Sequence, residues 1–158
     1  MFINRLVLLI LFFSSYAHAE LNIQNWKTPN GSQVFFVENH SLPVVDVNVM
    51  FSAGSVRDSK QTNGVASMTN HLMFSGSAGM SEQKLMNSFA DIGAQIGSNF
   101  NRDQSSFSLR TLSEEKSEAI ELFKVVLQKP NFDKEILDRE AKRYVANIAQ
   151  AETMPEAI

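Results

Sequence analysis

The segment that most constrains the fold is Gly64-Val65-Ala66-Ser67-Met68-Thr69-Asn70-His71-Leu72-Met73-Phe74-Ser75-Gly76. Its apolar residues recur with helical spacing, which predicts a helix over residues 63–74 with one face turned toward a core. That predicted buried face consists of Val65, Met68, Thr69 and Leu72. Glycines follow directly and break the helix, so we expect the chain to turn after it.

Strands are predicted on both sides of this helix. Residues 44–51 are rich in valine and alternate in part between apolar and polar side chains, as a strand does. The turn signal Pro29-Asn30-Gly31 between two further strand-like runs favours a hairpin. The predicted strands cover residues 24–28, 33–38, 44–51, 94–99 and 105–112.

Three more helices complete the predicted elements. Ser81 is expected to cap a helix over residues 82–92, and Ser113 to cap a helix over residues 114–127. A proline separates the second of these from a last helix over about residues 133–151. Helices alternating with pairs of strands predict an α+β fold in which an antiparallel or mixed sheet is covered by helices.

The N-terminal residues have the three-part pattern of a secretory signal. Arg5 supplies the positive charge, residues 6–13 form a continuous apolar run, and Ala17-His18-Ala19 is a small-x-small cleavage site. We therefore expect cleavage after Ala19, which divides the chain into a signal peptide (1–19) and one domain (20–158).

This apolar run is shorter than the roughly 20 residues that a membrane-spanning helix needs. An uncleaved membrane anchor is the alternative interpretation of the same residues. No later stretch is long enough to span a bilayer, so we expect no stable membrane span after cleavage. The prediction is export across the inner membrane to the periplasm.

Composition narrows the possible chemistry. The formal net charge of −3 offers no basic excess with which to neutralise phosphates, so nucleic acid is not an expected partner. The sequence has no cysteine, which excludes disulfides, thiolate zinc sites and a cysteine nucleophile.

Several phrases, in order, resemble the N-terminal domain of the pitrilysin/insulinase-type zinc peptidases. The resemblance covers about residues 26–155, and its ordered set of phrases is more specific than any one of them. Beside the helix phrase at 64–76 and the turn Arg102-Asp103, the phrases are Val47-Asn48-Val49-Met50-Phe51-Ser52-Ala53-Gly54-Ser55-Val56-Arg57-Asp58, Gly93-Ala94-Gln95-Ile96, Lys129-Pro130-Asn131-Phe132 and Asp138-Arg139-Glu140.

The resemblance implies a zinc motif, H-x-x-E-H, on the first helix. Two histidines four residues apart lie on one helical face and bind one metal ion, and the glutamate between them acts as general base. In this sequence the two ligand positions are Ser67 and His71, and the general-base position is Asn70. The distal ligand, a glutamate in the family, falls on Asn147, and Glu140 matches a supporting acidic position seven residues earlier.

These substitutions predict that the zinc site is degenerate. Neutral serine and asparagine oxygens are poor zinc ligands, and an asparagine cannot take a proton from water at neutral pH. His71 is either a surviving ligand or an ordinary hydrogen-bonded helix residue. Glu140 is expected to form salt bridges with neighbours such as Arg139, Lys142 or Arg143.

The resemblance therefore implies a non-catalytic member of the family with no intact catalytic residue and no bound cofactor expected. Such a chain would pair with an active zinc-bearing homologue as a heterodimer and shape a chamber for a peptide or unfolded polypeptide. The alternatives are a divergent zinc metalloendopeptidase and a structural or assembly protein. We also expect the domain to be truncated at its C-terminal end, because the complete unit of the family is much longer.

Overall fold

The computed structural model describes residues 22–153. The predicted signal peptide and its cleavage site at Ala19 lie outside these residues. These residues divide into two compact units, of which the first ends at Leu42 and the second begins at Pro43. In the first unit, strands β1 (Ile23–Lys27) and β2 (Gln33–Val37) pair as an antiparallel hairpin, which confirms the predicted turn between them.

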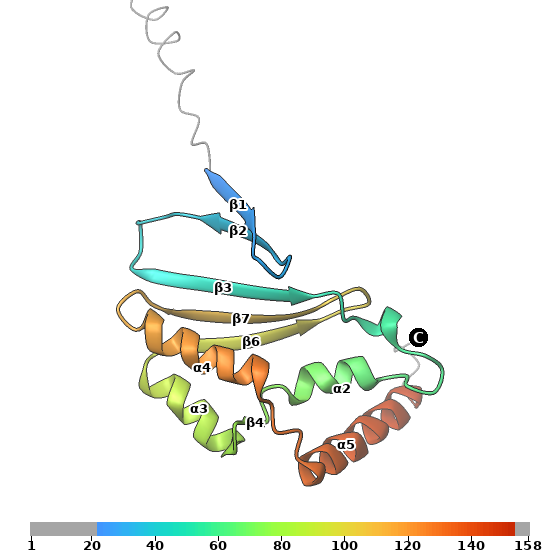
Figure 1. The fold of residues 1–158 in the computed structure, drawn as a ribbon. Helices are drawn as coiled ribbons and strands as arrows, with labels where there is room; N and C mark the ends of the chain where they lie inside the picture. Colours follow the sequence, from blue (N-terminus) through green and yellow to red (C-terminus); the bar gives the residue numbers. More distant parts are fainter. Residues whose placement is uncertain (1–21, 154–158) are drawn as a thin grey trace, which may run out of the picture. The chain divides into compact units, whose positions relative to one another are not determined.

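The second unit is built on a three-stranded antiparallel sheet with the order β3-β7-β6 (Figure 1). The strands are β3 (Val44–Phe51), β6 (Gln95–Phe100) and β7 (Ser105–Leu112). Phe107 on the central strand lies opposite Val49 of β3 and Ser98 of β6. The alternation of buried and exposed residues along β7 gives the sheet one apolar face and one polar face.

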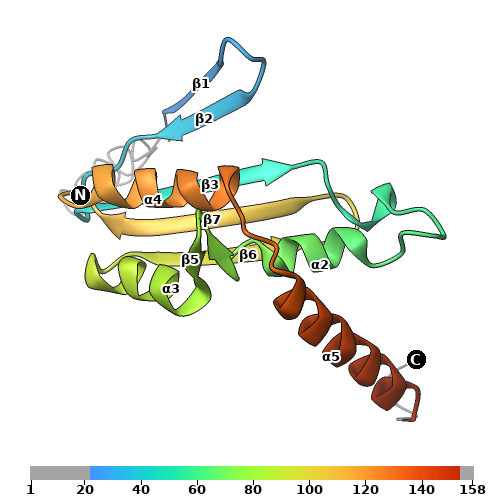
Figure 2. The same ribbon diagram turned by 60° about the horizontal axis from the view of Figure 1, so that its bottom comes forward.

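Helices cover the apolar face (Figure 2). The core contains Leu85 and Phe89 of α3 (Glu82–Asp91) and Phe123 of α4 (Lys116–Gln128), together with Phe107 and Leu109 of β7. The predicted α+β class, with helices on an antiparallel sheet, is confirmed.

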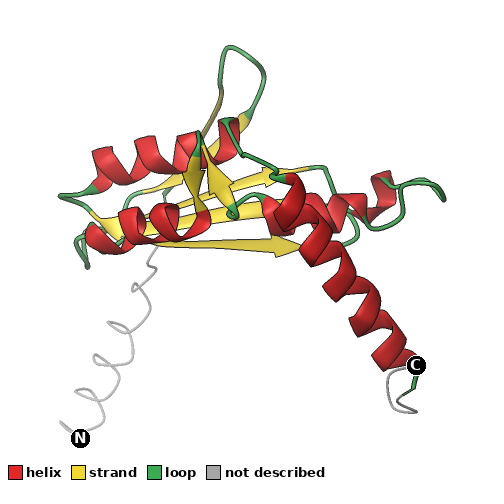
Figure 3. Cartoon of the chain, turned by 90° about the horizontal axis from the view of Figure 1, so that it is seen from below, coloured by secondary structure: helices red, strands yellow, loops and turns green. Residues whose placement is uncertain are grey.

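The shorter elements link the sheet to two other helices. The remaining elements of this unit are η1 (Ser55–Arg57), α2 (Val65–Leu72), β4 (Gly76–Ser77), β5 (Met80–Ser81) and α5 (Lys134–Glu152). Figure 3 shows α5 extending away from the layer formed by the sheet and the other helices. Among its described side chains, only that of Glu140 is buried.

Two local predictions were wrong. Ser113 does not cap α4, because this helix begins at Lys116 after a turn and the backbone N–H of Ser113 bonds to the carbonyl of Pro43. The buried face of α2 also differs, since Val65 and Thr69 are exposed whereas Asn70 is buried. Hydrogen bonds donated by its side-chain amide allow this polar residue to be buried.

Thr111 has a buried hydroxyl whose removal should stabilise the protein. The residue is 2% exposed, and its Oγ1 has no hydrogen-bond partner among the described residues. Thr111→Val keeps the shape of the side chain and removes an unpaired polar atom. We therefore expect the free energy of unfolding, measured in urea, to rise by about 1 kcal/mol. Thr62→Val, which removes a hydroxyl that accepts from Ser59 N at 2.8 Å, is the control and should not stabilise. Equal effects of the two changes would contradict the prediction.

Candidate functional site

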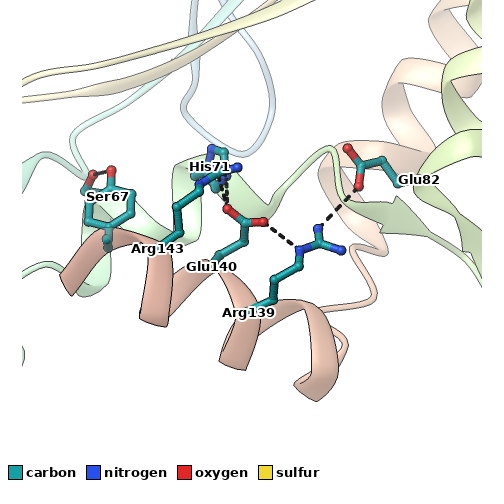
Figure 4. A network of polar contacts seen from close by, with 7 residues as sticks. Ser67, His71, Glu82, Arg139, Glu140 and Arg143 are labelled. Carbon is teal, nitrogen blue, oxygen red and sulfur yellow. Dashed lines mark hydrogen bonds and ion pairs between the residues drawn. The ribbon is translucent and has the colours of Figure 1, made fainter. Parts of the chain in front are cut away.

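Two hydrogen bonds join α2 to α5 (Figure 4). Ser67 and His71 are four residues apart and therefore lie on one side of α2. The Ser67 hydroxyl lies 2.8 Å from the hydroxyl of Tyr144, and His71 Nε2 lies 3.1 Å from Glu140 Oε2. Glu140 and Tyr144 are likewise four residues apart on α5, so the two bonds form parallel rungs between the helices.

The carboxylate of Glu140 is the centre of this arrangement. Glu140 is 3% exposed, and each of its oxygens has a guanidinium partner. Arg139 Nε donates to Oε1 at 2.9 Å, and Arg143 Nη2 lies 2.5 Å from Oε2. Arg139 also reaches Glu82 of α3 at 3.9 Å (Figure 4). A buried carboxylate is tolerated here because it is paired twice.

His71 contacts both members of the Glu140–Arg143 pair. Arg143 Nη2 lies 3.1 Å from His71 Nε2, which is the same nitrogen that faces Glu140. One ring nitrogen cannot donate to the carboxylate and accept from the guanidinium at once. His71 Nε2 therefore donates to Glu140 in one tautomer of the ring and accepts from Arg143 in the other. We call Ser67, His71, Glu140, Arg143 and Tyr144 the α2–α5 cluster.

The charges around Glu140 lower the pKa of its carboxyl group. The hydrogen bond from Arg139 is the largest cause, and burial, which raises the pKa, is outweighed. The hydrogen bond from His71 and the positive charges of Arg143 and Arg139 act in the same direction as the first cause. Glu140 is therefore an anion in the folded protein at neutral pH.

This lowered pKa predicts an acid-sensitive contribution to stability. A carboxyl whose folded pKa is depressed stabilises the protein above its ordinary value of 4.5, and this stabilisation is lost as the pH falls through the folded pKa. Glu140→Gln should therefore destabilise the protein at neutral pH but lose part of that deficit at about pH 3. Denaturant unfolding of both proteins at the two pH values measures this. Glu135→Gln is the control, because Glu135 is exposed on the same helix and forms no ion pair among the described residues. A Glu140→Gln deficit that does not depend on pH would contradict the prediction.

Asn70 lies on a different side of α2 from the cluster. Asn70 is 5% exposed. Its Nδ2 atom donates to Ser105 Oγ at 2.6 Å and to the Asn99 carbonyl oxygen at 3.3 Å. The amide thus joins α2 to the start of β7 and to edge strand β6. Asn147, at the substituted position of the distal ligand, is exposed on α5 one turn beyond Tyr144.

The structure therefore brings together Ser67, His71 and Glu140 of the predicted site residues, but not Asn70 or Asn147. Among residues 22–153, no three histidine, aspartate or glutamate side chains gather to hold a metal ion. A zinc ion is ordinarily held by at least three protein ligands. The cluster offers one imidazole and one carboxylate, and the carboxylate already bonds to arginines, so this donor set does not fit zinc.

A cleft of about 300 Å³ opens beside the cluster. Its lining combines charged side chains from α3 and α5 with apolar ones: His71, Phe74, Ser75, Glu82, Met86, Ser98, Arg139, Glu140 and Arg143. Ser98 belongs to edge strand β6, so the cleft adjoins the border of the sheet.

The role of Tyr144 was missed in the sequence. Its spacing contained a usable signal, because Tyr144 follows Glu140 by four residues just as His71 follows Ser67 by four. A pair of four-residue spacings on two helices is the pattern of side chains that meet in rungs. The predicted partners of Glu140 were correct for Arg139 and Arg143, whereas Lys142 is exposed and forms no ion pair among the described residues.

Comparison with known proteins identifies related sequences. Residues 33–158 match the family described as Insulinase (Peptidase family M16). The probable mitochondrial-processing peptidase subunit beta of Arabidopsis thaliana is 25% identical, over 82% of this chain and 24% of the relative. The cytochrome b-c1 complex subunit 1 of Bos taurus is 23% identical, and the match covers 73% of this chain and 24% of the relative. The chain thus spans about a quarter of the length of these relatives.

Solved structures show the same fold. A crystal structure of a peptidase M16 inactive domain from Pseudomonas fluorescens superposes with a TM-score of 0.82 and 34% identity, covering 87% of this chain and 34% of that one. A protease from Helicobacter pylori superposes with a TM-score of 0.65 and 20% identity, and the match covers 73% of this chain and 28% of that one.

No helix in the described part of the chain is long and apolar enough to cross a membrane.

Proposed function

The chain belongs to the insulinase family, peptidase family M16, and from this premise we propose that it is a non-catalytic member with a degenerate zinc site. Its contribution is a surface for peptides or unfolded polypeptide, presented to an active zinc-bearing homologue. The observation that carries the proposal is the placement of Asn70, whose amide bonds to Ser105 and Asn99 inside the fold.

The proposed protein lacks general-base catalysis, because its general-base position is an asparagine. Position 70 corresponds by resemblance to the glutamate that activates water, and an amide accepts no proton at neutral pH. Loss of a general base alone costs about 10²–10⁴ in rate. The Asn70 amide bonds to groups within the fold, and Asn70 is not among the residues that line the cleft.

The proposed protein also does not bind zinc at the former ligand positions. Of the vestigial ligand positions, Ser67 bonds to Tyr144, His71 contacts Glu140 and Arg143, and Asn147 is exposed with a neutral amide. Supporting residue Glu140 is paired with two arginines. The family depends on zinc, but this chain has exchanged imidazole and carboxylate donors for weaker ligands.

A partner role fits the names of the relatives. The similar proteins include a subunit of a mitochondrial processing peptidase and a subunit of the cytochrome b-c1 complex, and the Pseudomonas structure is described as an inactive domain. We propose that this chain likewise works within an assembly, as a heterodimer with a zinc-bearing family member. The match to the cytochrome b-c1 subunit favours a structural or assembly role as the second candidate.

The proposed route to this assembly is secretion. Residues 1–19 serve as a signal peptide cleaved after Ala19, and residues 20–158 form the peptidase-like domain in the periplasm. Sequencing the N-terminus of the protein recovered from a periplasmic extract tests the route. A mature chain that begins at Glu20 supports it, and an intact Met1 in a membrane fraction contradicts it.

Peptide cleavage distinguishes these functions. The purified protein should not cleave a fluorogenic peptide library in a manner sensitive to a zinc chelator, whereas a mixture with a zinc-bearing family member from the same organism should cleave faster than that member alone. Chelator-sensitive cleavage by the purified protein would establish a divergent metalloendopeptidase instead. Binding to the homologue without any change in cleavage would favour the structural role.

A further inference from the structure

We propose that Arg143 serves as a built-in cation of the α2–α5 cluster and holds the two helices together without a metal ion. This inference rests on the proposed function, because it assigns a new role to the residues of a site that no longer binds zinc. The observation behind it is that one guanidinium nitrogen, Arg143 Nη2, lies within 3.1 Å of both His71 Nε2 and Glu140 Oε2.

The geometry of these three atoms resembles that around a shared cation. The ring nitrogen and the carboxylate oxygen are 3.1 Å apart. Two ligands of one tetrahedral zinc ion, each about 2.0–2.1 Å from the metal, would be about 3.3 Å apart. Here Arg143 Nη2 approaches both atoms and supplies the positive charge. An imidazole and a carboxylate from different helices are thus drawn together by a side chain of the protein itself.

The Arg143 guanidinium matters because α5 has few other contacts with the rest of the unit. None of the residues of α5 belongs to the hydrophobic core, and Glu140 is its one buried side chain among those described. Val145 and Ile148 of this helix are exposed, and its apolar packing is limited to half-buried side chains such as Ile136 and Ala141. The polar contacts with α2 and the ion pair of Arg139 with Glu82 therefore supply the specific contacts between α5 and the rest of the unit.

A second rung supports the same interpretation. The Ser67–Tyr144 hydrogen bond lies one helical turn from the His71–Glu140 contact on both helices. Ser67 stands at a position that resembles a zinc ligand, so both rungs use former ligand positions of α2. In a zinc-bearing member the metal links these two helices. In this chain hydrogen bonds and the Arg143 cation take over that structural link.

Hydrogen exchange tests the role of Arg143 directly. The whole purified protein and three variants, Arg143→Gln, Tyr144→Phe and Lys142→Gln, are compared in buffer containing a chelator, with the exchange of α5 amides expressed relative to α4. Lys142 is the matched control, because it is an exposed neighbour on α5 that loses the same charge. We expect the relative exchange of α5 to rise about tenfold in Arg143→Gln, since a buried carboxylate loses one partner.

Tyr144→Phe and the control Lys142→Gln show whether the effect is specific to Arg143. Tyr144→Phe should raise the relative exchange of α5 about threefold, because it removes one hydrogen bond and little else. Lys142→Gln should leave the ratio unchanged. If Arg143→Gln behaves like Lys142→Gln, Arg143 does not hold the helices together and the inference is overturned. That result leaves the loss of peptidase activity intact, because the cleavage assay tests it separately.

Discussion

Gly54→Ala is expected to destabilise the protein by about 3 kcal/mol or more, since a new Cβ has no room. A methyl group at this position would overlap the Arg102 carbonyl group and lie 2.5 Å from the Asp103 carbonyl carbon. Both neighbours are backbone atoms, which cannot rotate away as the end of a side chain can. The loop after β3 or the turn between β6 and β7 would therefore have to move.

That contact holds the loop in place through hydrogen bonds. The backbone N–H of Val56 donates to the Arg102 carbonyl at 2.9 Å, and that of Ser55 donates to the Asn101 carbonyl at 3.3 Å. The same loop leads to Asp58, whose carboxylate accepts from Gly64 N and Ala66 N at the start of α2. Displacing Gly54 thus disturbs the helix that carries Ser67 and His71.

Chemical denaturation measures the effect of Gly54→Ala, with Gly97→Ala as the matched control. Both glycines lie outside the left-handed region, but a Cβ at Gly97 meets only the Ser108 hydroxyl at 3.0 Å, which can rotate. The control should cost about 1 kcal/mol or less. Similar losses in the two variants would show that close backbone approach is not the reason for glycine at position 54.

Asn70→Asp is expected to cost about 2–4 kcal/mol, although it changes the shape of the side chain very little. Asn70 Nδ2 lies 3.3 Å from the Asn99 carbonyl, which is an acceptor. An aspartate would turn an oxygen toward that carbonyl and place a charge at a position that is 5% exposed. Ser105 could still donate to the carboxylate, so one of the two hydrogen bonds would survive.

Unfolding of Asn70→Asp at two pH values separates charge from shape. Burial raises the pKa of such a carboxyl above its ordinary value of about 3.9. The deficit should therefore be largest near neutral pH, shrink as the pH falls through the raised pKa, and lose its charge-dependent part below about pH 4. Asn99→Asp is the control, because Asn99 is exposed and the same change there should cost about 0.5 kcal/mol or less. An Asn70→Asp variant as stable as this control would show that position 70 still tolerates an acid.

The sequence predicted the elements of this fold well because local signals agreed with it. The strand at 44–51, the helix capped by Ser81 and the strands at 94–99 and 105–112 all formed, with bounds within one residue of those expected. The resemblance to the insulinase family is also confirmed. These features depend on periodicity and turn chemistry, which are visible within short stretches of sequence.

The arrangement of the site was less predictable, because it depends on contacts between residues far apart in the chain. Periodicity placed Thr69 in the core and gave no reason to bury Asn70, whose partners Ser105 and Asn99 lie about 30 residues or more away. Ser67 and Tyr144 are separated by 77 residues, so their hydrogen bond follows from how α5 folds back on α2. The vestigial zinc positions Ser67, His71 and Asn147 remain assignments by resemblance.

The zinc content of the purified protein, measured by elemental analysis after equilibration with zinc and removal of free metal, decides whether the zinc site is degenerate. A degenerate site predicts roughly 0.1 zinc per chain or less, because serine and asparagine are weak ligands and Arg143 already contacts His71 and Glu140. About one zinc per chain, lost on His71→Ala, would contradict the account and make the protein a candidate metallopeptidase.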